Sequence, residues 1–175
     1  MGDYETLVDR DNVFFQKHRN TPNEYRIISS CPLLKSTNII DIVRNNQLFE
    51  LIARLNSDIV LEYNNKNGII TYVICLDCMK EFGDKFMIKF RHNINITSEN
   101  DCIINGASVH HNSNEKYLRV FHLNSLQIML NISNNKFNAV ILYNMDKNEF
   151  NNIEIKLISS FLSKIVSKLN FYICN

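Results

Sequence analysis

The residues of this chain with the clearest potential for chemistry are two cysteines, Cys75 and Cys78, which are separated by two residues. Two thiolates at this spacing can bind one tetrahedral zinc ion, and a complete site needs two further ligands. In a minority interpretation Cys102 and His110 supply them. Alternation along the β-branched run before Cys75 directs this side chain into the core with Val73. We therefore favour buried thiols, with no metal and no cofactor.

Thiol redox chemistry is the other use of two cysteines at this spacing. A reactive thiol needs a pKa lowered by a positive neighbour or by a helix N-terminus, and Lys80 alone does not establish such an environment. The sequence contains no Gly-x-Ser-x-Gly, His-Glu-x-x-His or glycine-rich phosphate-binding motif. We therefore lean against an enzyme.

The charge balance argues against general binding to nucleic acid. Lys and Arg number 19, Asp and Glu number 18, and the formal net charge is +1. No run reaches the roughly 18 apolar residues of a membrane-spanning helix, and residues 1–10 are too acidic and polar for a signal peptide. Five cysteines, an odd number, lie mostly in apolar runs, as reduced thiols do. We expect a cytoplasmic or nuclear protein that is not secreted and does not bind membranes.

The elements that must position these residues are expected to form one domain. Residues 1–22 are a polar lead-in, and residues 23–175 are a single α+β domain. A helix is expected over residues 39–55, because good N-cap residues precede an apolar pattern of helical period. Two β-branched runs within residues 58–76, joined by an Asn-rich and Gly-containing turn, predict a hairpin.

The second half of the chain is expected to complete the sheet and then to close it with a helix. Further strands are predicted at residues 24–31, 85–90, 101–104, 117–123, 125–132 and 137–143. Asp146 and Glu149 resemble a capping box that opens the last helix. The expected fold is a central antiparallel sheet of about five to six strands, with the N-terminal helix and a long C-terminal amphipathic helix packed on it.

Residues 126–172 resemble the end of a GAF domain, a small sensory module of the PAS and profilin-like superfold. The resemblance is carried by a hairpin, an outgoing strand, Phe150, the acidic Glu154 four residues later and an amphipathic helix, with Asn144 in the preceding asparagine position. It implies ligand binding at Asn144, Phe150 and Glu154. Met145 stands where cyclic-nucleotide-binding members have Lys, so binding of that ligand class is not implied. A roadblock or longin-like domain has nearly the same order of elements and is the alternative fold.

The GAF resemblance and the missing catalytic motifs together favour a non-catalytic regulatory or assembly module that acts through protein contacts. The first alternative is a GAF domain that senses a small ligand. The second is a thiol-based redox enzyme of the free methionine sulfoxide reductase type, because those enzymes are stand-alone GAF domains with active cysteines in the middle of the chain.

The final helix supplies the expected interaction surface. Leu157, Phe161 and Val166 flank its main apolar stripe and widen it beyond the span of about 100° that one sheet face requires. A wide apolar surface of this kind is a solubility liability unless something covers it. We therefore expect a protein partner or a homodimer at these three residues.

Overall fold

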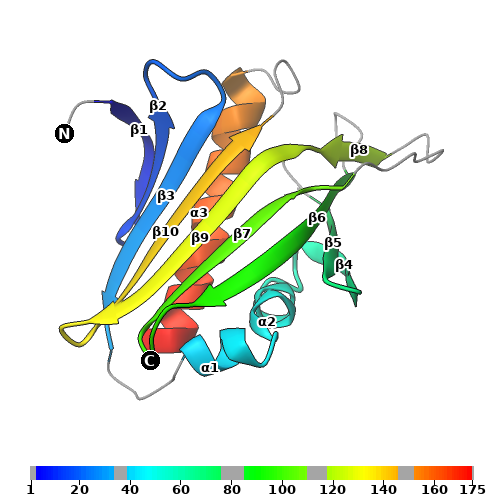
Figure 1. Cartoon of the computed structure of the whole chain (residues 1–175). Coiled ribbons are helices and arrows are strands. Elements are labelled where there is room, and N and C mark those ends of the chain that lie inside the picture. The colour runs from blue at the N-terminus through cyan, green and yellow to red at the C-terminus, as the bar shows by residue number, and fades with distance from the viewer. Residues whose placement is uncertain (1–2, 34–38, 76–84, 110–117, 146–151, 175) are drawn as a thin grey trace.

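Long antiparallel strands account for most of this chain. The structure is a computed structural model, and it describes residues 3–33, 39–75, 85–109, 118–145 and 152–174. Within these residues the fold is α+β, with one large sheet and a long C-terminal helix (Figure 1). The strands are β1 (Tyr4–Arg10), β2 (Val13–His18), β3 (Glu24–Pro32), β4 (Val60–Lys66), β5 (Ile69–Cys75), β6 (Lys85–Ile96), β7 (Asp101–Ser108), β8 (Leu118–Phe121), β9 (Leu123–Ser133) and β10 (Lys136–Met145).

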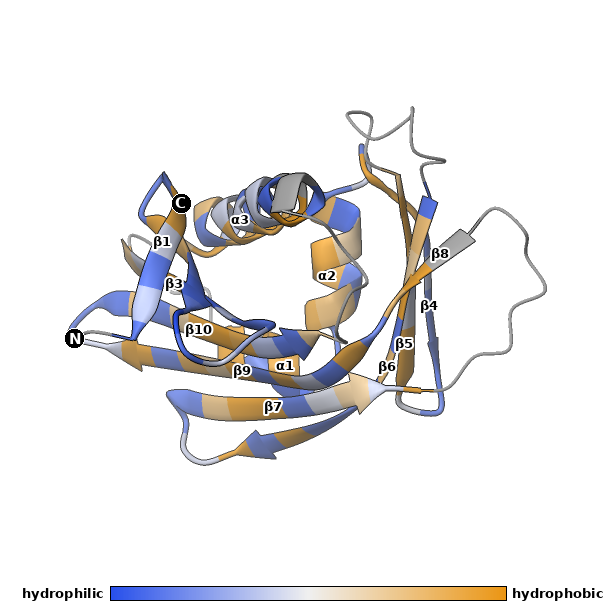
Figure 2. Cartoon of the chain, turned by 90° about the horizontal axis from the view of Figure 1, so that it is seen from above, coloured by the Kyte–Doolittle hydropathy of each residue, from blue (hydrophilic) through white to orange (hydrophobic). Residues whose placement is uncertain are grey.

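The sheet joins the first part of the chain to the last. Its order is β1-β2-β3-β10-β9-β7-β6-β5-β4, and the short β8 pairs in parallel with β6 off this path. All the other described pairings are antiparallel. The central pairing of β3 with β10 joins segments more than 100 residues apart, with Pro32 opposite Lys136. A twisted sheet of this size curls, and this one curves into a U (Figure 2).

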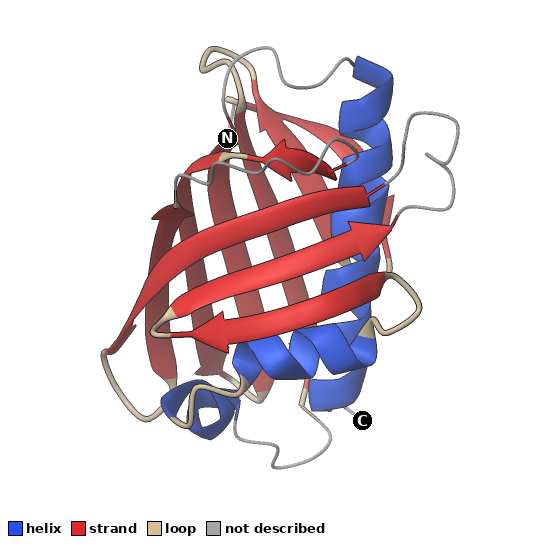
Figure 3. Ribbon diagram, turned by 90° about the vertical axis from the view of Figure 1, so that its right-hand side faces the viewer, coloured by secondary structure: helices blue, strands red, loops and turns tan. Residues whose placement is uncertain are grey.

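Three helices are described, namely α1 (Ile39–Arg44), α2 (Leu48–Leu55) and α3 (Asn152–Cys174). Of these, α2 and α3 close the open side of the U (Figure 2). The long α3 packs against β1, β2 and β3 and also contacts α2. Figures 2 and 3 show α3 along the inside of the curved sheet, with α1 and α2 together near one end. The apolar faces of the sheet and of α3 therefore enclose a common interior.

Asparagine forms the turns that hold the hairpins in register. Two-residue loops connect β1 to β2, β4 to β5 and β9 to β10, and both residues of each loop have positive φ. Such loops match the right-handed twist of the strands. In the β4–β5 turn, Asn67 has φ 54° and Gly68 has φ 72°. The hairpin predicted for residues 58–76 is thus confirmed, together with its turn.

The structure corrects the expected sheet and the expected first helix. The sheet has ten strands rather than five to six. Residues 39–55 form two short helices, because the chain turns between them at Asn46, whose φ is 59°. The segment expected as a lead-in, residues 1–22, contributes β1 and β2 to the sheet edge, and Val13 and Phe15 are fully buried there. Asp146 and Glu149 lie outside the described residues.

Candidate functional site

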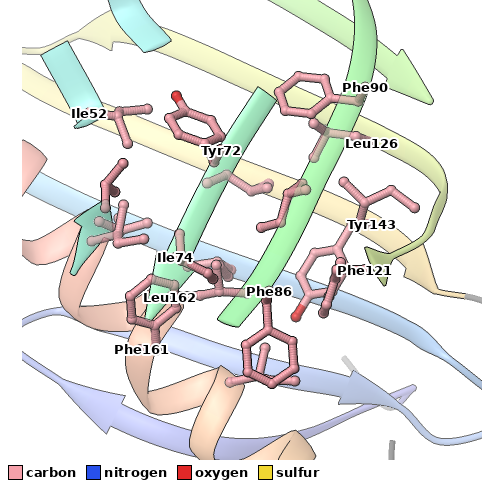
Figure 4. Close-up of a pocket in the computed structure, with 18 of the residues that line it drawn as sticks. Ile52, Tyr72, Ile74, Phe86, Phe90, Phe121, Leu126, Tyr143, Phe161 and Leu162 are labelled. Carbon is pink, nitrogen blue, oxygen red and sulfur yellow. The ribbon is translucent and has the colours of Figure 1, made fainter. Parts of the chain in front are cut away.

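The candidate site is an internal cavity between the concave side of the sheet and the helices α2 and α3 (Figure 4). Its volume is about 150 Å³. The described residues that line it are aliphatic or aromatic, and none of them carries a charge. They are Ile27, Phe49, Ile52, Val60, Tyr72, Ile74, Phe86, Ile88, Phe90, Phe121, Leu123, Leu126, Ile141, Tyr143, Ile158, Phe161, Leu162, Ile165 and Val166.

Two simple periodicities place these side chains around one space. Along each strand every second residue faces the interior, so Ile74, Tyr72 and Ile141, Tyr143 point inward from β5 and β10. Along α3 the lining residues recur at spacings of three and four, which is one face of a helix. The cavity remains because the U of the sheet is wider than these side chains can fill.

Two of the lining residues are tyrosines, but their hydroxyls are buried in the surrounding protein and the surface of the cavity is apolar. Tyr72 donates a hydrogen bond of 2.7 Å from Oη to the backbone carbonyl of Phe49 on α2. The hydroxyl of Tyr143 is buried and has no hydrogen-bond partner in the described part of the chain. In Figure 4 the two hydroxyl oxygens lie on opposite sides of the cavity. Burial raises the pKa of both side chains well above the ordinary 10.0, so both stay protonated and remain donors.

Aromatic packing fixes the orientation of the Tyr143 ring. Tyr143 is the direct cross-strand partner of Tyr25 on β3, and the two rings are stacked with centroids 5.5 Å apart. Phe15 on β2 packs against both rings. The hydroxyl of Tyr25 is also buried and has no partner among the described residues. The aromatic cluster therefore buries two hydroxyls that have no partner among the described residues.

The ligand-binding residues implied by the GAF resemblance are placed elsewhere. Asn144 follows Tyr143 on β10 and so faces the other side of the sheet, where its Oδ1 accepts a hydrogen bond of 3.2 Å from Asn124 Nδ2. Glu154 is buried in the first turn of α3. Neither residue is among the described residues that line the cavity. Phe150 lies outside the described residues.

The residues expected at a protein interface point into the molecule. Phe161 and Val166 are only 7% and 4% exposed, and both line the cavity. The side chain of Leu157 lies outside what the structure describes. The extra width of the apolar surface on α3 is therefore used inside the fold, because the curved sheet meets this helix over more than one face.

The cysteines of the minority zinc interpretation do not come together. Cys75 pairs with Lys85 at the start of β6, whereas Cys102 pairs with Ile96 at its end, and this strand of 12 residues places them roughly 35 Å apart. Cys78 and His110 lie outside the described residues. Within residues that are described, no group of three or more His, Cys, Asp or Glu side chains could hold a metal ion.

A disulfide joins Cys31 near the end of β3 to Cys174 at the end of α3. This corrects the expectation of reduced thiols for these two residues, which lie 143 positions apart in the sequence. No local sequence pattern predicts this disulfide, because β3 and the end of α3 meet only in the folded chain. Cys75 and Cys102 are free thiols, and burial is the largest cause that raises the pKa of Cys102 to about 11.

Sequence reasoning missed the residues that enclose the cavity from the sheet. Alternation predicts that Tyr72 and Tyr143 face inward, but it does not show that the sheet curves or that empty space remains inside it.

In the described parts of the chain, no helix combines the length and the apolar content that crossing a membrane requires. The predicted cytoplasmic or nuclear location stays a prediction.

Comparisons with known proteins find solved structures with a similar fold. No family model matches this sequence, and no curated protein matches it. Three human structures match almost the whole chain. STARD10 has a TM-score of 0.73 at 13% identity and covers 99% of this chain and 74% of its own. The lipid transfer and protein localization domain of StarD13 has 0.65 at 11%, covering 97% and 88%. StAR-related lipid transfer protein 5 has 0.63 at 9%, covering 99% and 85%.

These matches correct both the GAF resemblance and the function drawn from it. At identities of 9–13% they show the fold alone. A strand followed by an amphipathic helix ends this fold as well as a GAF domain, so residues 126–172 could not distinguish the two. The interpretation as a GAF-like protein-contact regulatory module is likewise wrong. The chain has the α+β fold of the StAR-related lipid transfer domains, with a large antiparallel sheet closed by a C-terminal helix.

Proposed function

We propose that this protein binds an apolar, lipid-type ligand inside its curved sheet. The observation that carries the proposal is the internal cavity, whose described lining is aliphatic and aromatic and presents an apolar surface. Ligand sites are usually concave and mostly apolar, with a few placed polar groups. A hydrocarbon group that enters this space leaves water and gains contacts on all sides.

A cavity of this volume lowers the stability of the fold unless a ligand fills it. At the cost known for engineered core cavities, 150 Å³ of empty space destabilises a fold by about 3–4 kcal/mol relative to a filled core. That is a large share of the stability of an ordinary domain. A ligand that fills the space recovers part of this free energy, and the protein need not be unstable without it.

The same volume sets the size of the ligand in this conformation. An engineered cavity of about 150 Å³, lined by similar side chains, binds benzene. A ring or a short chain therefore fits the cavity as it stands. A long acyl chain exceeds it, so binding one requires α2 or α3 to move away from the sheet.

The fold supports the proposal independently. The names of two of the matching proteins describe lipid transfer, and this chain shares their architecture over nearly its whole length. Shared fold does not fix function. The cavity, which belongs to this chain's own side chains, is what makes the same use plausible here.

Binding of a small aromatic molecule tests the proposal. Toluene is neutral and close to benzene in size, and we expect isothermal titration calorimetry to show that it binds the purified protein saturably with one site per chain. Val166→Phe places a ring in the cavity from α3 and should weaken toluene binding at least tenfold. Because it fills a space, its cost in the free energy of unfolding should stay within the range of about 1–3 kcal/mol for overpacking.

Leu61→Phe is the matched control. Leu61 on β4 is 49% exposed and does not line the cavity, so the same introduced residue should leave toluene binding unchanged. Native mass spectrometry after incubation with phosphatidylcholine vesicles then shows whether long-chain lipids also enter. A wild-type protein that shows no saturable toluene binding and emerges from the vesicles without bound lipid would refute the proposal.

A further inference from the structure

The disulfide that ties the end of α3 to the sheet lies in the wall of an open surface groove. Both of its cysteines, Cys31 and Cys174, are among the described residues that line this groove, whose volume is about 1160 Å³. Cys31 is half-buried, whereas Cys174 is only 5% exposed. Thiol–disulfide exchange requires that a thiolate reach one of the two sulfur atoms. The groove gives a small reductant a path to this bond, and Cys31 is the more exposed of the two residues.

The charges around the groove favour the approach of an anion. Three cationic side chains line it, namely Arg10, Lys164 and Lys168. Arg10 is paired with Asp11, while the two lysines share a single carboxylate, that of Asp58. These three cations and two carboxylates together have a net charge of +1. A thiolate is the reactive form of a thiol and is stabilised by positive neighbours, so this side of the molecule suits thiol chemistry.

The contacts beside the disulfide hold the last turns of α3 only weakly. The hydrogen bond from Ser29 Oγ to Asn170 Oδ1 is 3.4 Å long, which is longer than a normal hydrogen bond between these atoms. Asn170 Nδ2 and Ser167 Oγ are buried and have no hydrogen-bond partner among the described residues. Unpaired polar atoms of this kind destabilise the contact that buries them. The last turns of α3 therefore depend on the disulfide, together with the burial of Leu169 and Ile173, for their attachment.

A tie at one end limits how far the wall of the cavity can move. An α-helix rises about 1.5 Å per residue, so Val166, eight positions before Cys174, lies about 12 Å from the tie. While the bond is closed, α3 can leave the sheet only by pivoting at this end, and the wall moves less at Val166 than at Ile158. Once the bond opens, the whole helix can shift and make room for a longer ligand.

We propose that the Cys31–Cys174 bond is a site of reversible thiol–disulfide exchange, and that its state sets the size of the ligand that the protein accepts. The closed bond restricts the cavity to a ring or a short chain, and the open bond admits long-chain lipids. This inference rests on the proposed function, because it concerns access to the same cavity.

A dithiol is the reductant that this exchange requires. Its first thiolate attacks Sγ of Cys31, the S–S bond breaks, and Sγ of Cys174 leaves as a thiolate that takes a proton from water. The second thiolate of the reductant then attacks the reductant sulfur of the mixed disulfide, and Cys31 leaves and is protonated in turn. The dithiol loses two electrons and two protons and becomes a disulfide, and the protein gains two thiols.

Reduction of the folded protein tests the exchange site. Dithiothreitol is a small dithiol, and we expect it to make Cys31 and Cys174 available to iodoacetamide within minutes, at neutral pH and without denaturant. Hydrogen exchange of the amides in the last turns of α3 should then become about tenfold faster, while that of β9 and β10 stays unchanged. Oxidised glutathione should restore the slow exchange. A bond that is reduced only in denaturant would overturn the proposal.

Two ligands separate an effect on ligand size from a general loss of structure. Toluene fits the cavity as it stands, so calorimetry should give Kd values for the oxidised and the reduced protein that agree within about twofold. Loading with phosphatidylcholine from vesicles, measured by native mass spectrometry, should be about fivefold or more higher for the reduced protein, the lower end of typical coupling between two sites.

Two cysteine variants control for other actions of the reductant. Cys31→Ser removes the bond and should load lipid like the reduced protein, with or without dithiothreitol. Cys75→Ser removes a free thiol that is not among the groove-lining residues, and it should keep the full response to dithiothreitol. If Cys31→Ser folds poorly, the reduced wild type supplies the same comparison.

The outcomes separate this inference from the proposed function. If the reduced wild type loses toluene binding and unfolds, the bond is a structural cross-link only and the inference is wrong. Equal lipid loading in the two states, with toluene binding intact, also overturns it and leaves the proposed function standing. If neither state binds toluene or lipid, the proposed function fails and the selection by size fails with it, whatever dithiothreitol does to the bond.

Discussion

The two ends of α3 meet the same sheet in different ways. The N-terminal part, residues 152–166, borders the cavity through Ile158, Phe161, Leu162, Ile165 and Val166. The C-terminal part, residues 167–174, is attached to the sheet. Ser29 Oγ on β3 donates a hydrogen bond of 3.4 Å to Asn170 Oδ1, Cys174 is bonded to Cys31, and Ile173 is fully buried.

This difference shows how one helix can be both a wall and an anchor. A helix that borders empty space lacks contacts there and gains little from packing. The C-terminal part of α3 can hold the helix against the sheet without such contacts. The cavity can then persist inside a stable fold, and any movement that admits a larger ligand is expected in the N-terminal part of α3.

The largest expected effect comes from breaking the anchor. The disulfide closes a loop of 143 residues, and the chain-entropy account gives it about 5 kcal/mol of the free energy of unfolding. Urea unfolding of the oxidised protein should show a loss approaching this size on reduction or in Cys31→Ser. Cys75→Ser, at a free thiol, should leave the effect of reduction intact. Identical unfolding curves with and without reductant would show that the anchor is not covalent in solution.

The next test compares one isoleucine from the N-terminal part of α3 with one from its C-terminal part. Ile173→Ala removes a fully buried side chain and should lower the free energy of unfolding by about 3–4 kcal/mol. Ile158→Ala should cost about 1–2 kcal/mol less, because Ile158 already borders the cavity and has fewer atoms in contact with it. Chemical denaturation of both variants measures the difference. Equal losses, or a larger loss at Ile158, would contradict the comparison.

The smallest expected effect is an ion pair that depends on pH. Asp58 accepts hydrogen bonds from Lys168 Nζ at 2.6 Å and Lys164 Nζ at 3.2 Å, both on α3. The hydrogen bond from Lys168 is the main cause that lowers the pKa of Asp58 below 3.8. Because the groups are largely exposed, Asp58→Asn should cost less than about 1 kcal/mol at neutral pH.

The sign of the pH dependence follows from the lowered pKa. The stabilisation by Asp58 is fully present above its ordinary pKa of 3.8 and is lost as the pH falls through the lower value of the folded state. The free energies of unfolding of the wild type and of Asp58→Asn should therefore converge only in strong acid. A difference that persists unchanged through strong acid would mean that it does not come from the charge of Asp58.

Much of the local structure was predictable because it depends on neighbours in the sequence. The hairpin at 58–76 follows from β-branched runs and a turn that needs positive φ. Six of the seven described non-glycine residues with positive φ are asparagines, which adopt this conformation more readily than other side chains. Simple alternation in this hairpin predicts that Leu61 is buried on the same face as Ile59, and this is wrong, since a register shift between Val60 and Glu62 leaves Leu61 49% exposed.

By itself the sequence determined which faces are apolar, where most strands lie and that a long amphipathic helix ends the chain. Only the tertiary structure decided what the apolar faces enclose. The pairing of β3 with β10 and the Cys31–Cys174 bond join segments far apart in the chain. The curvature of the sheet results from twist summed over many strands. The spacing of apolar residues along the sequence does not reveal these long-range pairings or the curvature. It therefore showed how wide the apolar surface of α3 is, but not whether a partner protein or an internal cavity lies against it.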